Sequence, residues 1–378
     1  MGVAVQELHD KASRAWFGIS NIVAKNKRME VEKIFNIFDS LVTPVALYGC
    51  EFWLPLIIPK KSLSQKNNLL TFWKDLLCEK INQKCARLSL SVNNKTSRLA
   101  VLGELGRYPL YIKALSQCLN YNMSLLGPDR HNSLLSDTLI EMQCMSLRGT
   151  DCWLARVEKM QKLLSIPDRP FFKKTNGKKC TDSLKSRFDR FWLDSINMTG
   201  KTQNDTTDQS DHNKLRTYRR FKASFTREPY IDLVRNRNQK SFLSRLRTGS
   251  HHLNIEKGRW TRPVTPVEQR TCQYCTPSTV RSSPRSGQSP SASAAIDNEQ
   301  HFLMSCSRFS DMRKSAFEEI NFISPQFLSL SENQQFYTLL CPTEAKTAKI
   351  TNRLIKQMFL DRGKIDQLNG NEDNASYQ

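Results

Sequence analysis

Cys272-Gln-Tyr-Cys275 and His301-Phe-Leu-Met-Ser-Cys306 are the two short stretches around which this chain is organised. They are separated by 25 residues and together have the spacing C-x2-C…H-x4-C. Two thiolates two residues apart can bind one ion from a tight turn, and a His with a third Cys completes the four ligands of a tetrahedral zinc site. A closed shell of four protein ligands leaves no position for a reactive water. The spacing therefore predicts a structural zinc and not a catalytic one.

The segment between the two pairs is long for a zinc loop. Residues 277–295 are rich in Ser, Pro and Arg, which predicts a flexible insertion. Lengthening a loop from about 8 to about 25 residues costs only roughly 1 kcal/mol, whereas a structural zinc contributes roughly 10–16 kcal/mol. The insertion is therefore compatible with the site. The alternative is that four ordinary buried residues fall near each other in a chain with 11 Cys.

His301 and Cys306 are five residues apart, a separation that an ordinary helix does not bring onto one face. On an ideal α-helix such residues point about 140° away from each other. We therefore expect a helix that begins near Asp297 to carry His301, with Cys306 at its distorted end.

Length and charge set the class of protein and of partner. The chain has 378 residues, of which 39% are hydrophobic, enough for two or three domains with real cores. Its 57 Lys and Arg against 36 Asp and Glu give a net charge of +21, which favours a polyanionic partner. Residues 214–270 alone hold 15 Lys and Arg and 4 Asp and Glu, a net charge of +11.

The cysteines and the apolar segments indicate the compartment. The 11 Cys have no spacing typical of a secreted scaffold, which indicates a reducing environment. No basic segment followed by an apolar run begins the chain, so no secretory signal is predicted. The apolar stretch 41–59 is interrupted by two Pro and one Glu and predicts a buried helix pair, not a membrane span. We expect an intracellular protein, nuclear or cytoplasmic, without a membrane partner.

Apolar residues recur at helical spacing along most of the chain. The polar stretch 197–213 interrupts this pattern and predicts a linker. The predicted fold is mainly α: a helical bundle over 1–196, the linker over 197–213, a basic helical segment over 214–271, a zinc module over 272–306, a closing helical subdomain over 307–368 and a disordered tail over 369–378.

The basic segment contains two stretches that carry cations opposite an apolar stripe. The first stripe runs from Leu215 to Phe225 and the second from Phe242 to Leu246. Packing of the stripes would hold the cations outward, which predicts phosphate contacts, and Trp260 in a turn is a candidate for stacking on a base. The alternative is a solvated helix face. The predicted nucleic-acid contacts are Arg219, Arg220, Lys222, Arg245, Arg247, Arg259 and Trp260.

Three stretches of the chain resemble reverse transcriptases of LINE-type (non-LTR) retrotransposons. Residues 38–53 (Phe-Asp-Ser-Leu-Val-Thr-Pro-Val-Ala-Leu-Tyr-Gly-Cys-Glu-Phe-Trp) resemble the segment just after the palm of that family. Residues 104–112 (Glu-Leu-Gly-Arg-Tyr-Pro-Leu-Tyr-Ile) are similar to the entry into its helical thumb and linker. Residues 246–259, followed by the region from Cys272 to Cys306, resemble its C-terminal Cys-Cys-His-Cys region. The long loop between Cys275 and His301 departs from the compact version of that region.

The resemblance implies thumb-like helices, a linker and a zinc region that holds template RNA or target DNA during target-primed reverse transcription. The partners it implies are RNA or DNA and the upstream polymerase region of the parent protein. A polymerase palm needs aspartates for two magnesium ions, yet Tyr-x-Asp-Asp does not occur here and no two Asp are adjacent. We therefore expect a chain that begins past the palm and has no enzymatic activity.

The sequence also contains two adjacent histidines and is compatible with a second class of function. His251 and His252 have no evident carboxylate partner in the sequence and are expected to be turn or phosphate-facing residues. The competing class of function is a helical interaction module with a structural zinc and a basic face for an acidic protein partner. Salt dependence separates the two classes, because binding to nucleic acid weakens steeply with the logarithm of salt concentration.

Overall fold

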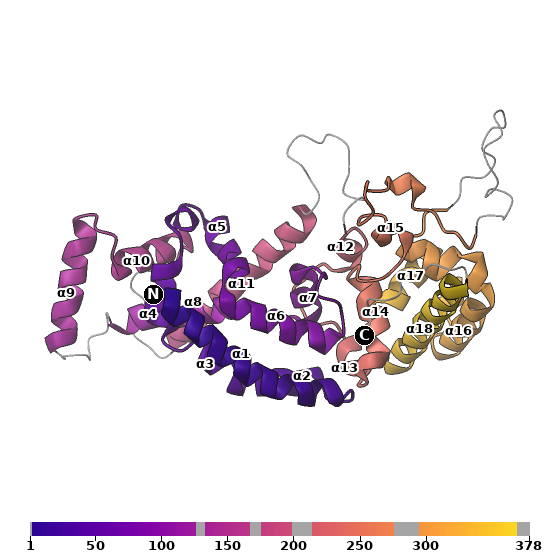
Figure 1. Cartoon of the computed structure of the whole chain (residues 1–378), viewed down its shortest axis with the longest axis horizontal. Coiled ribbons are helices and arrows are strands. Elements are labelled where there is room, and N and C mark those ends of the chain that lie inside the picture. The colour runs from indigo at the N-terminus through magenta and orange to yellow at the C-terminus, as the bar shows by residue number, and fades with distance from the viewer. Residues whose placement is uncertain (1, 126–132, 167–174, 199–213, 276–294, 369–378) are drawn as a thin grey trace.

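The computed structural model describes residues 2–125, 133–166, 175–198, 214–275 and 295–368. Over these ranges the chain is helical and forms no strand, and an isolated antiparallel bridge joins Thr271 to Ile296. The prediction of a mainly α fold is confirmed. The described helices form an elongated molecule, with α9 (Ser133–Leu147) near one end and α16 (Ser310–Ile323) near the other (Figure 1).

The N-terminal part is a bundle centred on α8 (Leu110–Leu125), which packs against α4, α10 and α11. A second layer is formed by α1, which packs against α3 and α6. The helices of this part, besides α8 and α9, are α1 (Gly2–Lys25), α2 (Val31–Leu41), α3 (Thr43–Ala46), α4 (Cys50–Ile57), α5 (Lys66–Thr71), α6 (Leu77–Leu90), α7 (Arg98–Leu105), α10 (Trp153–Leu163) and α11 (Thr175–Met198), with 3-10 turns η1 (Lys60–Leu63) and η2 (Phe72–Asp75).

The apolar stretch 41–59 forms the expected helix pair, α3 and α4. Cys50 and Leu54 of α4 are buried against the bundle, with Pro55 inside the helix. Within the described residues, no helix is long and apolar enough to cross a membrane.

The C-terminal part is built on α18 (Ala345–Leu368), which packs against α14 and α16. Its other helices are α12 (Tyr218–Phe221), α13 (Tyr230–Leu233), α14 (Arg237–Arg247), α15 (Asn254–Lys257) and α17 (Glu332–Leu340), with 3-10 turns η4 (Val267–Gln269), η7 (Ser307–Phe309) and η8 (Phe327–Ser329) and a π-helical turn η6 (His301–Ser305).

The two parts share one continuous hydrophobic core. Phe225, from the basic segment, packs edge-on against Phe188 and Trp192 of α11, with ring centroids 5.5 and 5.1 Å away. Trp192 also donates from Nε1 to the carbonyl of Leu99 over 2.9 Å. Gly103 makes this approach possible, because a Cβ there would lie 2.2 Å from the indole of Trp192. The core therefore runs across the predicted boundary at 197–213. Most of the predicted linker (199–213), the predicted insertion (277–294) and the predicted tail (369–378) lie outside the described residues.

The helix predicted over 215–225 is wrong beyond Phe221. Helix α12 spans only Tyr218–Phe221, and the chain then leaves the helical path. The buried Lys222 ammonium donates to the carbonyl of Thr226 and contacts the carboxylate of Glu228, which holds the chain in a turn. The turn places Phe225 in the aromatic cluster on α11, a contact that a continued helix would not make.

Candidate metal centre

The four predicted ligands lie together at one point. Their ligand atoms, the Sγ atoms of Cys272, Cys275 and Cys306 and a ring nitrogen of His301, are all within 4.8 Å of one another. Cys275 Sγ is 3.4 Å from both His301 Nε2 and Cys306 Sγ, and Cys272 Sγ is 3.9 Å from Cys306 Sγ. A zinc tetrahedron with Zn–S bonds of about 2.3 Å and a Zn–N bond of about 2.0 Å has S···S edges of about 3.8 Å and S···N edges of about 3.5 Å. The group therefore has the dimensions of a metal site.

The first ligand pair is positioned by a backbone clamp. The antiparallel bridge between Thr271 and Ile296 places the chain before Cys272 beside the chain that leads to His301. Cys272 N donates to the carbonyl of Ala295 over 2.8 Å, and Asp297 N donates to the carbonyl of Arg270 over 2.9 Å. The clamp brings together ligands that are 26 residues apart in sequence.

The second pair is brought together by a π-helical turn. A helix begins at Glu299 and widens into η6 (His301–Ser305), in which Cys306 N donates to the carbonyl of His301 over 2.8 Å. This i→i+5 bond inserts an extra residue into the turn and brings residues five apart onto one side. The expectation of a distorted helix end at Cys306 is therefore met by a π-turn. Asn298 Oδ1 accepts from the backbone N–H of His301 over 2.8 Å and fixes the start of the turn.

Neighbouring donors stabilise negative charge on the ligands. Ser307 Oγ donates to Cys275 Sγ over 3.4 Å, and Arg313 Nη2 donates to the carbonyl of Cys306 over 3.0 Å. A hydrogen bond with Cys306, aided by His301, lowers the pKa of the Cys272 thiol to about 3, and the contact with Cys272 raises the pKa of His301. The hydrogen bond between Cys272 and Cys306 also raises the pKa of the Cys306 thiol. A divalent cation requires these thiols and the imidazole in their deprotonated forms, so its binding would release protons.

Two buried ion pairs hold the second ligand pair to the rest of the protein. The guanidinium of Arg362 in α18 donates to both carboxylate oxygens of Asp297, over 2.9 and 2.6 Å, and lies 4.9 Å from the ring of Tyr274 between the first two Cys. Glu299 accepts from Arg216 over 2.6 and 2.7 Å and contacts His251 Nε2 at 2.8 Å. The sequence offered no indication of these pairs, because the partners lie 48 to 83 residues apart.

His251 therefore differs from its expected role. It is buried and paired with Glu299, so the expectation that it lacks a carboxylate partner is wrong, and it does not face solvent. His252 beside it is exposed. Cys341, the nearest further Cys in sequence, lies outside the cluster, and its Sγ accepts from Arg247 Nη1 over 3.1 Å.

The predicted phosphate-binding cations do not form one exposed face. Lys222 and Arg247 are buried and ion-paired, so the expectation that packing holds them outward is wrong for both. Arg245 is half-buried and donates to the carbonyl of Ser91 over 3.0 Å, and Arg259 is half-buried beside Glu256 at 3.2 Å. Arg220 is exposed, Arg219 is half-buried, and Trp260 is 61% exposed.

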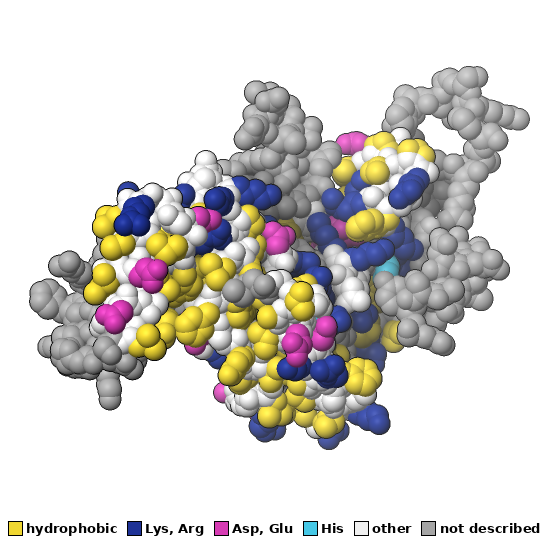
Figure 2. Space-filling view, turned by 60° about the vertical axis from the view of Figure 1, so that its left-hand side comes forward, with side chains coloured by type: hydrophobic (Ala, Val, Ile, Leu, Met, Phe, Trp, Pro, Cys, Tyr) yellow, Lys and Arg dark blue, Asp and Glu magenta, His cyan; other side chains and the backbone are white. Residues whose placement is uncertain are grey.

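Figure 2 shows how charge is distributed over one face of the molecule. Apolar side chains are frequent over the helices of the N-terminal part, and Lys and Arg gather beneath the lobe at upper right. Cations of the N-terminal part were missed by the sequence reasoning, among them Arg98 and Lys95, whose ammonium lies 5.0 Å from the centre of the Trp260 ring. Lys95 lies in the turn after α6 and Arg98 at the start of α7, far in sequence from the basic segment, so composition gave no signal for them.

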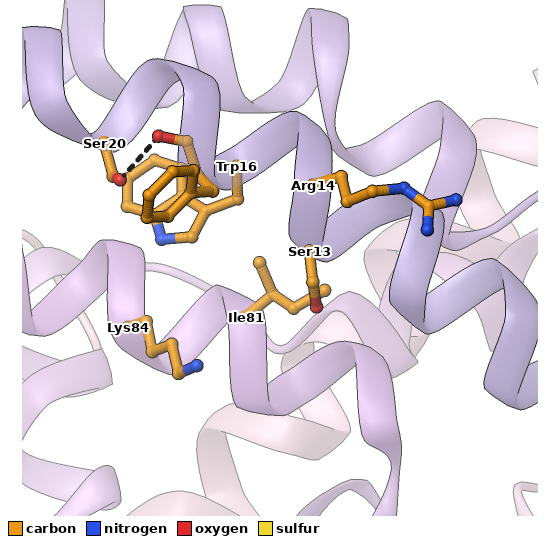
Figure 3. Close-up of a pocket in the computed structure, with 7 residues that line it drawn as sticks. Ser13, Arg14, Trp16, Ser20, Ile81 and Lys84 are labelled. Atoms are coloured by element: carbon orange, nitrogen blue, oxygen red, sulfur yellow. Dashed lines mark hydrogen bonds between the residues drawn. The ribbon is translucent and has the colours of Figure 1, made fainter.

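A pocket of about 500 Å³ lies between α1 and α6 (Figure 3). Its lining includes Trp16, Phe17 and Ile81 together with Arg14 and Lys84, and Ser20 Oγ donates to the carbonyl of Phe17 over 3.0 Å. None of the described lining residues is a Cys, His or carboxylate. The pocket therefore offers neither a set of metal ligands nor an acid–base pair.

No protein-family model, no curated protein and no solved structure matches the chain. The fold and the site therefore define its class on their own: a mainly helical protein with a Cys3His group that could hold a metal ion near its C-terminal end.

Proposed function

We propose that this chain is a zinc-stabilised, non-catalytic C-terminal portion of a LINE-type retrotransposon reverse transcriptase, and that it binds template RNA or target DNA through phosphate contacts. The observation that carries the proposal is the bonding of the Cys3His group to the basic segment. Arg216 of that segment bridges Glu256 and Glu299, and Glu299 lies two residues before the ligand His301. A metal bound at the Cys3His group would therefore fix the segment that carries the excess of positive charge.

Zinc is the metal that this ligand set favours. Three soft thiolates with one imidazole in a compact tetrahedron are typical of structural zinc and leave no coordination site for a substrate or water. Three of the distances between ligand atoms are 3.4 to 3.9 Å, close to the edges of such a tetrahedron, and all four atoms lie within 4.8 Å of one another. In this proposal the zinc stabilises the fold and takes part in no reaction.

Phosphate contacts are proposed for the cations that reach the surface. Arg219, Arg220, Arg245 and Arg259 remain candidates, with Trp260 for stacking, whereas the buried Lys222 and Arg247 belong to the core. Phosphate contacts supply most of the affinity in non-specific complexes and are independent of base sequence. In the intact parent protein the upstream polymerase region would supply the magnesium-binding aspartates, and the complex would be an intracellular ribonucleoprotein.

A salt series tests the nucleic-acid part of the proposal. The zinc-loaded chain is titrated against a short labelled oligonucleotide from about 50 to about 200 mM salt, and four phosphate contacts predict a log–log slope of roughly −3 to −4. The variant Arg219→Ala/Arg220→Ala/Arg259→Ala should bind more weakly with a flatter slope. The matched control, Lys314→Ala/Lys346→Ala/Lys349→Ala, removes three exposed cations from α16 and α18 and should change both quantities little.

Three outcomes would contradict the proposal. An unchanged slope for the arginine variant would make those residues a solvated face. Equal affinity for polyglutamate and for an oligonucleotide of the same charge would favour the protein-interaction module. A primer-extension assay with magnesium or manganese should give no product, and template-dependent incorporation would contradict the non-catalytic assignment.

A further inference from the structure

Four cations and one exposed indole from distant parts of the chain meet on one surface, here named the Trp260 ridge. Arg87 lies in the last turn of α6, Lys95 in the turn that follows, and Arg98 at the start of α7. Lys214 precedes α12, and Trp260 follows α15. The ridge therefore joins the N-terminal bundle to the C-terminal part.

Contacts between these residues show that they are neighbours. Lys214 Nζ donates to the carbonyl of Lys95 over 3.1 Å, and the Lys95 ammonium lies 5.0 Å from the centre of the Trp260 ring. Arg87 Nη2 donates to the carbonyl of Thr96 over 3.1 Å in the same turn. Burial and the nearby charge of Arg98 lower the pKa of Arg87, which places these two guanidinium groups close together, and Arg98 Nη1 also donates to the carbonyl of Lys74 over 2.8 Å.

The positive charge of the ridge is not neutralised by these bonds. Among the described residues, the hydrogen-bond acceptors of Arg87, Arg98 and Lys214 are backbone carbonyls, which orient a cation without cancelling its charge. Burial lowers the pKa of Lys214, and of its charged neighbours Glu256 opposes this effect while Arg259, Arg87 and Lys95 add to it. Cations held this close together create a local positive potential that attracts a polyanion.

Trp260 is displayed by an ordered turn. The backbone N–H of Trp260 donates to the carbonyl of Lys257 over 2.9 Å. The backbone N–H of Thr265 donates to the carbonyl of Gly258 over 3.0 Å, which closes the turn around Trp260. Thr261 Oγ1 also donates to that carbonyl over 3.0 Å. The indole is 61% exposed, although tryptophan side chains are usually covered in a folded core. An indole fixed in this way can stack on a base with little loss of conformational entropy.

We propose that the Trp260 ridge binds single-stranded nucleic acid, with an unpaired base stacked on Trp260 and the adjoining phosphates at Lys95, Arg98 and Lys214. The inference rests on the proposed function and narrows it to unpaired strands. A duplex hides the faces of its bases, so it can use the cations but not the indole. The ridge therefore favours a single strand over a duplex of equal length.

The test compares a labelled 20-nucleotide single strand with a 20-base-pair duplex by fluorescence anisotropy, using the zinc-loaded full chain. Stacking of one base predicts that Trp260→Ala weakens single-strand binding by roughly 5- to 150-fold, with less than about 2-fold change for the duplex. Trp260→Phe should restore part of the loss. Lys95→Glu should weaken binding of both, whereas the control Lys349→Glu, with the same change of charge at an exposed lysine of α18, should not.

The outcomes separate this inference from the proposed function. If the wild-type chain binds neither oligonucleotide, the proposed function and the inference both fail. If it binds but Trp260→Ala keeps its single-strand affinity, only the ridge assignment fails. Equal losses on single strand and duplex would show that Trp260 supports folding or general binding and would overturn the single-strand assignment. A thermal melt of each variant excludes unfolding as the cause.

Discussion

Arg247 Nη2 donates to Glu104 Oε1 over 2.8 Å, and neither side chain exposes any surface to solvent. The same guanidinium contacts Glu228 at 2.6 Å and donates to the carbonyl of Leu340 over 2.7 Å. These bonds connect α7, the basic segment and the end of α17. Arg247, for which the sequence analysis predicted a phosphate contact, thus links three segments of the buried core.

Arg247→Ala should therefore destabilise the fold. Removing one partner leaves Glu104 buried without its counter-charge, which typically costs about 3–5 kcal/mol. Arg235→Ala is the matched control, because Arg235 is 80% exposed and forms a long ion pair of 4.0 Å with Glu30. This variant should change the free energy of unfolding by less than about 0.5 kcal/mol. Urea unfolding measures both, and similar midpoints for the two variants would contradict the role given to Arg247.

The four residues of the Cys3His group should be required for zinc binding. The purified chain is expected to hold about one zinc, and Cys275→Ser/Cys306→Ser should hold none, whereas Cys144→Ser, at an exposed position on α9, should keep it. Affinity should fall as the pH is lowered, because protons compete with the metal for thiolates and imidazole. Metal analysis after dialysis checks the stoichiometry. Full zinc retention by the double variant would rule out this ligand set.

Arg362→Gln should weaken metal binding without touching a ligand. The change removes the two bonds to Asp297 that hold the chain before His301, and loss of such outer support typically costs about 10- to 100-fold in metal affinity. Arg353→Gln on the same helix breaks an exposed pair with Glu319 and serves as the control. Competition with a chromophoric chelator measures both affinities. Equal affinities would show that the Asp297 pair is not coupled to the site.

Glu79 should make stability depend on pH. Burial raises the pKa of its carboxyl from 4.5 to about 7, against hydrogen bonds from Asn82 and from the N–H of Tyr111. Because the folded state holds the proton more tightly, stability is highest below about pH 4.5 for this group and falls by roughly 3 kcal/mol as pH rises to about 7. Glu79→Gln should flatten this part of the profile. Parallel urea midpoints from pH 5 to 8 for variant and wild type would contradict the assignment.

Periodicity and residue spacing predicted the helices and the proximity of the four Cys3His residues because both are local properties of sequence. The first two Cys need only a turn and the second pair only a widened helix, so the spacing alone pointed to the cluster. Periodicity is less informative about where a helix begins: apolar residues recur at helical spacing over 72–81, although the chain forms η2 before α6 begins at Leu77.

Burial of charge was not predictable in this way. Arg247 and Glu104 are 143 residues apart, and no helical pattern distinguishes a cation that meets a carboxylate in the core from one that meets water. The Trp260 ridge was missed for a related reason. Its cations come from α6, the turn after it, the start of α7 and the chain before α12, and only the folded chain brings them near Trp260.

The bridge between Thr271 and Ile296 makes residues 276–294 a suitable insertion point for a reporter. Both chain ends that enter this segment are already paired to each other by the bonds of Cys272 with Ala295 and of Arg270 with Asp297. Foreign sequence added between these paired ends would lengthen the loop without breaking their backbone hydrogen bonds. The entropic cost of closing a loop grows only slowly with the length of the loop. A fluorescent domain or affinity tag could therefore be carried within the chain, close to the Cys3His group.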